Sequence, residues 1–392
     1  MEKVSRSLTS TILSMSLLTV MAGAAIAPAL GIIKQHFADA PDLLVQLIVS
    51  IPALFIIVTN LFFLPISRML HTRAIALTGL LLYVVAGAGC FFVDDLYVLL
   101  SMRALLGISV GLIMPLSTGL LAYYFPPEEQ ARLMGLSAAM NQMGGVVATL
   151  LAGILATIEW NYGFLVYLLG LIAVVMVWRW LPDEQLDSAN KRGKAFEPRQ
   201  LLKFHPSVIG MLLLMTIFFI FPTNFAIITS QQTTLGATAI TIIMVALDVV
   251  AFFVGLLFGR LMHFFRKPIK YFAPLAFLLG YGLFVLNQSV TAIILGAALI
   301  GIATGVGVPY LNTIASIKGG KNSATTVMPL LSAALYLGQF VSPLLVMPLS
   351  LSLFGEADLT APYKVGIIIS VLFLLQVWST RHFQSLPPES HA

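Results

Sequence analysis

The stretch RALLGISVGLIMPLSTG, from Arg103 to Gly119, decides the fold of this chain. It is apolar apart from one arginine at its head, and its glycines lie four residues apart. A similar stretch, GIATGVGVP, begins at Gly301, and at the same offset of 194 residues the chain pairs Pro28/Pro222, Gly107/Gly301, Gly111/Gly305, Pro115/Pro309 and Gly144/Gly338. A constant offset across several apolar segments indicates two duplicated helical bundles, which is a known transporter plan.

The composition indicates an integral membrane protein. Of the 392 residues, 59% are hydrophobic and 9% are charged, and the mean hydropathy is +0.98. Soluble domains carry about 25% charged residues, and a soluble chain of this length could not hide so much apolar surface. The pI of about 9.3 then reports topology rather than a nucleic-acid partner. The single cysteine, Cys90, excludes an internal disulfide and has no metal-ligand spacing around it, so we expect no metal and no cofactor.

Twelve apolar segments are long enough to span a bilayer, since a spanning helix needs about 20 residues. They lie at about 9–33, 43–66, 73–93, 96–122, 132–157, 162–181, 205–229, 238–262, 269–288, 290–315, 323–348 and 361–380. The first is longer than the core of a secretory signal, and we interpret it as a retained span. The predicted organisation is an N-terminal six-helix bundle at 1–182, a cytoplasmic linker at 183–204 and a C-terminal six-helix bundle at 205–392.

The charges between the spans predict the orientation. With the N-terminus in the cytoplasm, nearly all Lys and Arg residues fall in inner loops, and the outer loops hold Asp39, Asp42, Asp94, Asp95, Glu159, Glu356 and Asp358. This is the positive-inside pattern. We therefore expect a multi-pass protein of the cytoplasmic (inner) membrane with both termini cytoplasmic.

The loop after the second span is FFLPISRMLHTR, and its repeat in the second half is GLLFGRLMHFFRK. With these segments and its repeated, glycine-spaced spans, the chain resembles the major facilitator superfamily over nearly its whole length. The two loops are similar to the family's inner-loop motif, although Ser67 and Gly259 replace its acid. The resemblance implies that Arg68, Arg73, Gly255 and Arg260 take part in conformational gating; the alternative is that these arginines anchor the inner interface.

The fourth and fifth spans carry two further patterns. RALLGISVG is similar to the family's signature of an arginine followed by spaced glycines, which adds Gly107 and Gly111 to the gating set. NQMGGVVATLLAGILA keeps Gly144 and Gly145 of the antiporter signature but has Ala148 and Thr149 in place of its Gly-Pro pair. The flanks of this segment resemble the twelve-helix drug:proton antiporter branch. The resemblance implies alternating access by a monomer.

Two charged residues lie deep inside predicted spans, well away from the span ends. Arg103 follows Asp95 by eight residues, a depth of about 12 Å, and Asp248 lies at similar depth in the eighth span. Their repeat positions hold Ala297 and Leu54, so neither charge is duplicated. Intramembrane ionisable residues are functional candidates by default. We expect Asp248 to carry a proton, with Arg103 as its modulator or as a ligand for an anionic substrate. The alternatives are a static ion pair and a snorkelling arginine.

The remaining substrate site is predicted to be mostly apolar. Its candidate lining residues are Arg103, Asn141, Gln142, Phe218, Phe221, Asn224, Phe225, Tyr310, Asn312, Tyr336 and Gln339. Each polar member alone is also explained by hydrogen bonding between helices.

A secondary transporter for a small apolar or amphipathic compound, working by proton-coupled export, is the interpretation that these features favour. The alternative is uptake, or facilitated diffusion of a small metabolite or organic anion, without proton antiport. No Walker sequence supports ATP hydrolysis, the six histidines lie at loops, helix ends or tails, and no helix has the continuous polar stripe of a channel. The sequence therefore predicts a transporter and not an enzyme, with protons, a small molecule and the lipid bilayer as partners.

Overall fold

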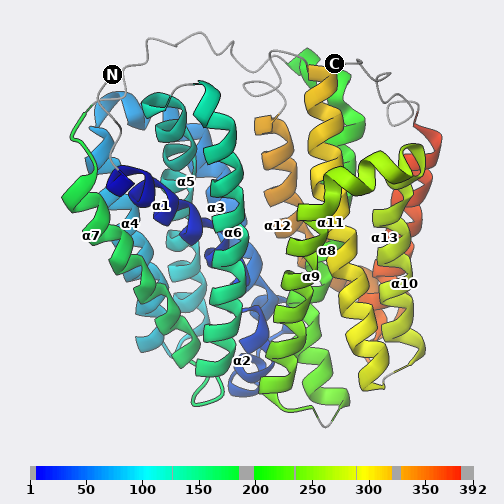
Figure 1. Cartoon of the computed structure of the whole chain (residues 1–392). Helices are drawn as coiled ribbons and strands as arrows, with labels where there is room; N and C mark the ends of the chain where they lie inside the picture. Colours follow the sequence, from blue (N-terminus) through cyan, green and yellow to red (C-terminus); the bar gives the residue numbers. More distant parts are fainter. Residues whose placement is uncertain are drawn as a thin grey trace. The chain divides into compact units, whose positions relative to one another are not determined.

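The structure is a computed structural model that describes residues 6–125, 127–184, 198–233, 235–287, 289–319 and 328–380. In these ranges the chain is almost entirely helical and has no strand (Figure 1). Twelve candidate spans are long and apolar enough to cross a membrane. The predicted all-α fold and its number of spans are confirmed, whereas most of the predicted linker lies outside the described residues.

The elements follow one another without long connections in the described ranges. The first ten are α1 (Arg6–Ala24), η1 (Ala27–Ala29), α2 (Leu30–His36), α3 (Asp42–Met69), α4 (Thr72–Ala88), η2 (Gly89–Phe92), α5 (Leu96–Tyr124), α6 (Pro127–Leu155), η3 (Tyr162–Leu169) and α7 (Gly170–Trp180). The others are α8 (Pro198–Gln232), α9 (Ala237–Phe265), η5 (Lys267–Tyr271), α10 (Phe272–Leu286), α11 (Val290–Gly319), α12 (Met328–Phe354) and α13 (Ala361–Ser379).

The first span is broken. Helix α1 ends at Ala24, a 3-10 turn with Pro28 in its first positions follows, and α2 continues from Leu30. Proline has no N–H to donate and its ring clashes with the preceding turn, so a break at this point is expected. By contrast, α5, α8 and α11 run without interruption through Pro115, Pro222 and Pro309. The four prolines that match in the repeat therefore have unequal effects on the helices.

The chain divides into two compact units. Unit 1 comprises Met1–Asn190 and Pro222–Val245, and unit 2 comprises Lys191–Phe221 and Ala246–Ala392. The second part of α8 and the first part of α9 thus pack with unit 1. The sequence-based division, with all of 205–392 in one bundle, stays a prediction.

Glycines allow close helix crossings in both units. Gly107 and Gly111 of α5 lie against the Pro52 backbone and Thr59 of α3, where an added Cβ atom would overlap them. In unit 2, a Cβ atom on Gly301 or Gly305 of α11 would lie 2.7 Å from a carbonyl oxygen of α9. The close packing expected of small residues spaced by four is observed in both halves of the repeat.

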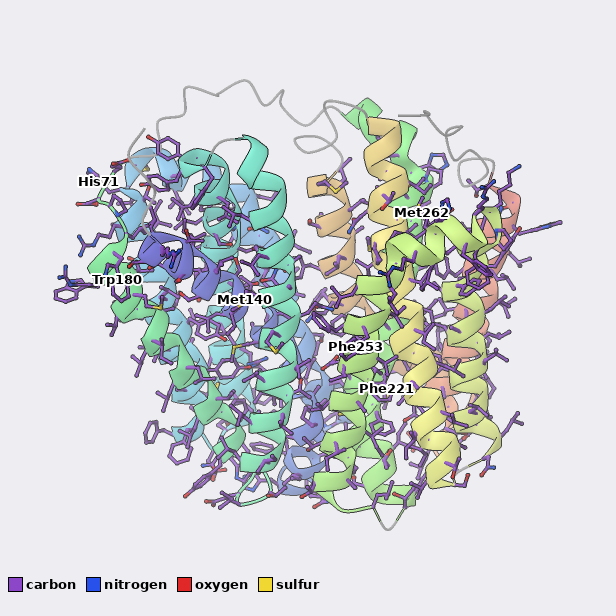
Figure 2. All side chains as sticks on the ribbon, in the orientation of Figure 1. His71, Met140, Trp180, Phe221, Phe253 and Met262 are labelled. Atoms are coloured by element: carbon purple, nitrogen blue, oxygen red, sulfur yellow. The ribbon has the colours of Figure 1, made fainter. Side chains whose placement is uncertain are left out.

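Apolar side chains also cover the outside of the helices. Trp180, which Figure 2 shows projecting outward at the end of α7, is 44% exposed, and Phe253 on α9 is 57% exposed. Such exposure suits contact with lipid rather than water. The one thiol of the chain, Cys90, is fully buried and donates a hydrogen bond to the Ala86 carbonyl oxygen.

Candidate functional site

Arg103 is fully enclosed inside unit 1. Its side chain on α5 is 0% exposed. Its Nε donates to the Ile48 carbonyl oxygen at 2.7 Å, one terminal nitrogen donates to the Tyr167 hydroxyl at 2.6 Å, and the other donates to the Ala22 carbonyl oxygen. The guanidinium also lies 5.5 Å from the centre of the Tyr167 ring. The Arg103 side chain therefore links α5 to α1, α3 and η3.

The two carbonyl groups that Arg103 binds lack the usual partner within their own helices. Ile48 lies four residues before Pro52, which has no N–H to donate back along α3. Ala22 lies in the last turn of α1, where the final backbone bond recorded runs from the Ala25 N–H to the Met21 carbonyl oxygen. The last carbonyls of a helix need a partner from outside the helix. Arg103 supplies that partner at two places, which accounts for a permanent charge in an apolar segment.

Tyr167 completes this arrangement. Its hydroxyl accepts from Arg103 and lies 3.3 Å from the Ala22 carbonyl oxygen, to which it donates. Sequence reasoning missed Tyr167, Ile48 and Ala22. Pro52 was an available signal for Ile48, because a proline leaves the carbonyl four residues before it without a helical partner.

Asp248 lies on α9 in unit 2 and is half-buried. Among the candidate spans as described, it is the one acidic residue away from a helix end. All the partners given above for Arg103 belong to unit 1. The proposed Arg103–Asp248 pair joins residues of different units and stays a prediction.

Helices α1 and α6 meet along a seam of polar groups, which we call the polar seam: Ser16, Thr19, Ser137 and Asn141. The hydroxyls of Ser16 and Ser137 share a hydrogen bond of 2.7 Å, and the Thr19 hydroxyl donates to Asn141 Oδ1 at 2.9 Å. Gly144 of α6 lies directly against the Leu17 carbonyl oxygen. Of the polar seam, only Asn141 was predicted from the sequence.

A second buried polar group joins α3 to α8 within unit 1. Gln46 Nε2 donates to Asn224 Oδ1 at 2.8 Å, and Asn224 Nδ2 donates to Thr223 Oγ1 at 3.0 Å. All three side chains are at most 3% exposed. Asn224, predicted as a lining residue, thus makes a bond between helices in this structure, and Gln46 was not anticipated.

Two glycines make further contacts between Pro222–Val245 and the rest of unit 1. A Cβ atom on Gly31 would lie 2.6 Å from the Ala226 carbonyl oxygen of α8, and one on Gly153 of α6 would overlap Thr241 of α9. Together with the Gln46–Asn224 bond, these contacts hold the segment to three different elements.

The predicted aromatic residues differ in their surroundings. Phe221 and Phe225 are each 1% exposed, and Phe221 stacks on Phe284 of α10 with ring centres 5.9 Å apart. Phe218 is half-buried. Two of the three therefore belong to packed interior.

The other predicted residues are spread over both units. In unit 2, Tyr310 and Gln339 are buried, and Asn312 and Tyr336 are half-buried. In unit 1, Gln142 is exposed, and Gly145 packs against Val20 of α1. The nearest atom to a Cβ on Gly255 would be the Gly305 carbonyl oxygen, at 3.8 Å.

The basic residues that were predicted to take part in gating also lie in both units. Arg73 donates to the Trp178 carbonyl oxygen, and Arg260 is exposed at the end of α9. The side chain of Arg68 lies outside the described part. Among the described residues, no group of three or more His, Cys, Asp and Glu side chains could hold a metal ion.

Ion pairs join loop residues to the ends of the spans. His36 and Asp94 approach to 2.7 Å while His36 stacks on Trp160, and Lys364 pairs with Asp358. Hydrogen bonds from Lys364 and Thr360 hold the pKa of Asp358 below its usual value. These contacts tie loops together and lie apart from the buried polar groups.

Comparisons with known proteins agree with this architecture. A model of the Major Facilitator Superfamily matches residues 12–343. The quinolone resistance protein NorA of Staphylococcus aureus (strain MRSA252) is 27% identical over 332 residues, which cover 78% of this chain and 79% of that protein. The multidrug transporter protein MdtP of Bacillus subtilis (strain 168) is 26% identical over 122 residues, so the match spans 23% of that protein's length.

A solved structure extends the likeness to the fold. A bacterial homolog to the human lysosomal transporter Spinster, in an inward-facing and occupied conformation, has a TM-score of 0.77 at 17% identity. The match covers 98% of this chain and 97% of that one.

Proposed function

The chain belongs to the major facilitator superfamily, and we propose that it exports small apolar or amphipathic compounds in exchange for protons. Transport by alternating access is the family's common function. The likeness to NorA over most of both chains supports the drug-export branch. We place the protein in the cytoplasmic membrane as a monomer with both termini inside, following the distribution of its charges.

The observation that carries the proton-coupling proposal is the position of Asp248 along α9. Unit 1 ends within α9 at Val245 and unit 2 resumes at Ala246, so Asp248 lies three residues from the point where the helix passes between the units. In this proposal, a change in the packing of α9 near that point changes the surroundings of the carboxylate. Low-dielectric surroundings favour the neutral carboxyl group, whereas water or a nearby cation favours the carboxylate.

Proton binding at Asp248 would thereby shift the balance between two states. A ligand shifts a conformational equilibrium only by the difference in its affinity for the two states. Here the proton is that ligand, and the substrate is the second. Arg103 takes part indirectly in this proposal: it fixes α1, α3 and η3 relative to α5, so that unit 1 moves as one body.

The test is proton flux in liposomes that contain purified protein, with a quinolone such as norfloxacin as the probe. Wild type and Asp248→Asn are compared, with Asp39→Asn as the matched control because Asp39 is exposed in a loop. We expect norfloxacin-driven proton flux in wild type and in Asp39→Asn, and none in Asp248→Asn. Norfloxacin movement without proton flux, equal in all three proteins, would refute the proposal.

One observation favours a second function, which is uptake or facilitated diffusion without antiport. Ala148 and Thr149 stand where the antiporter signature has its Gly-Pro pair, and both are buried in α6. In this case Asp248 would serve in a static role. The flux measurement separates the two functions directly.

A further inference from the structure

Asn141 carries hydrogen-bond donors that have no acceptor among the described residues. The Thr19 hydroxyl shares its hydrogen between the Ser16 carbonyl oxygen, at 2.8 Å, and Asn141 Oδ1, at 2.9 Å. An asparagine amide has two N–H donors besides its oxygen. In the described part of the chain, no protein acceptor is recorded for Asn141 Nδ2, and the side chain is half-buried.

The neighbouring residues of α6 show how much of the helix surface near Asn141 is covered. Ala138, Gln142, Thr149 and Gly153 share one face of the helix, since residues about four and eleven apart align. At the Gly153 end this face is covered by Thr241 of α9, and Thr149 is 2% exposed. Towards the other end Ala138 and Gln142 are exposed.

Asn141 belongs to the polar seam and directly precedes Gln142, which lies on this face. Met140, which directly precedes Asn141 on α6, is labelled in Figure 2 and shows where Asn141 and Gln142 lie along the helix. Asn141 is anchored on one side by Thr19, and its neighbour Gln142 adds a second amide on the uncovered part of the face. Two amides are thus consecutive on α6, and that of Asn141 is held at its oxygen by the Thr19 hydroxyl.

The repeat shows that packing alone does not require these groups. The residues 194 positions after Ser16, Thr19, Ser137 and Asn141 are Gly210, Leu213, Leu331 and Leu335. The equivalent crossing in unit 2 still brings a glycine, Gly338, against a carbonyl oxygen, that of Leu212. The second crossing therefore packs without these four groups, and its polar contact is the bond from the Ser342 hydroxyl to the Thr216 carbonyl oxygen.

We propose that Asn141, held by Thr19 and assisted by Gln142, selects substrates that carry a carbonyl or carboxylate oxygen on an otherwise apolar framework. This inference rests on the proposed transport function and names the substrate class of that site. The amide N–H groups donate to the oxygen of the substrate. Sites built to hydrogen-bond a substrate group reject the analogue that lacks it, because the site's donors are then left unpaired.

The test is equilibrium binding of a matched pair, norfloxacin and its analogue with hydrogen in place of the 3-carboxylate, to purified protein without a proton gradient. We expect wild type to prefer norfloxacin by about 10-fold, since a hydrogen bond to a charged group is worth roughly 1.5–3 kcal/mol. Asn141→Leu, which installs the residue of the repeat, should remove the preference. Thr19→Val keeps the amide donors but releases them, so it should weaken the preference without removing it.

Folding is controlled by the thermal unfolding of each variant, and Asn141→Gln serves as a second variant that keeps the donors. Equal preference for norfloxacin in wild type and a folded Asn141→Leu protein would overturn the inference, and so would a wild type without preference. Binding that depends on Asn141 in a protein without proton flux would refute proton-coupled export and leave this inference standing. Proton flux with no effect of Asn141→Leu on binding would refute this inference alone.

Discussion

The crossing of α1 with α6 and that of α8 with α12 share their geometry and differ in their chemistry. In each, a glycine of the later helix lies against a carbonyl oxygen of the earlier one, Gly144 against Leu17 and Gly338 against Leu212. The first crossing adds hydroxyl and amide hydrogen bonds across the seam, where the second has apolar residues at the matching positions. The glycine contact is therefore common to both crossings, whereas the bonds between side chains occur in the first and the second has a bond from the Ser342 hydroxyl to the Thr216 carbonyl oxygen. The test with the largest expected effect is to substitute the glycine at each crossing, so that the two helices cannot approach as closely.

Substituting Gly144→Val should have the largest effect on folding. The new side chain overlaps the Leu17 carbonyl oxygen, and backbone atoms cannot rotate away as a flexible side chain can. We expect destabilisation of about 1–3 kcal/mol or more, measured as thermal unfolding in detergent, and a similar loss for Gly338→Val. Gly119→Val serves as control because a Cβ atom there meets nothing within 4 Å. A Gly144→Val protein as stable as that control would contradict the shared geometry.

Arg103 provides the next test, because its repeat position holds Ala297 and α8 is not broken as α1 is. Arg103→Lys keeps the charge but has no planar fork for three acceptors. We expect a loss of stability of about 1–3 kcal/mol for the groups left without a partner, with a smaller loss for Tyr167→Phe. Thermal unfolding of both variants checks this order. If Arg103→Lys were as stable as wild type, the carbonyl groups would not need the guanidinium.

The next test measures how much the hydrogen bond between Gln46 and Asn224, which joins α3 to α8, contributes to stability. Asn224→Leu leaves the buried Gln46 amide without its acceptor, which should cost about 1–3 kcal/mol. The double variant with Gln46→Leu should recover part of this loss, because two apolar partners are nearly neutral. A double-mutant cycle measures the coupling. Strict additivity of the two single effects would show that the bond contributes nothing.

The smallest expected effect lies at the surface, in the Asp358–Lys364 pair. The folded protein holds the pKa of Asp358 below its usual value of about 3.9. The stabilisation is therefore complete above that usual value and is lost as the pH falls below it through the folded-state pKa. Asp358→Asn should flatten the dependence of the unfolding temperature on pH below about 4. An unchanged profile between pH 5 and pH 2 would contradict this assignment.

Much of the fold could be predicted from the sequence, because its signals are local or periodic. Hydropathy gave the twelve spans, and the 194-residue offset located the equivalent glycine crossings. The partners of Arg103 could not be found in this way. They are backbone carbonyls: that of residue 48 lies four residues before Pro52, and that of residue 22 lies where α1 ends. An arginine in a membrane suggests a carboxylate first.

The polar seam was missed for a related reason. Serine and threonine inside a spanning helix commonly bond to their own backbone, as the Thr11 hydroxyl does to the Ser7 carbonyl oxygen. Thr19 is distinguished from hydroxyl residues that bond only to their own helix when each residue is compared with the one 194 positions later. That comparison needs the crossing of α1 with α6, which hydropathy does not provide.

The buried position of Cys90 has a practical consequence. A thiol that is enclosed in the protein reacts slowly with labelling reagents, and this chain has no other. Cysteines introduced at the exposed loop residues Asp39 and Leu359 could therefore carry a pair of spin labels or dyes without removal of the native residue. The distance between these labels, recorded with and without norfloxacin at two pH values, would follow the two halves through a transport cycle in an otherwise natural protein.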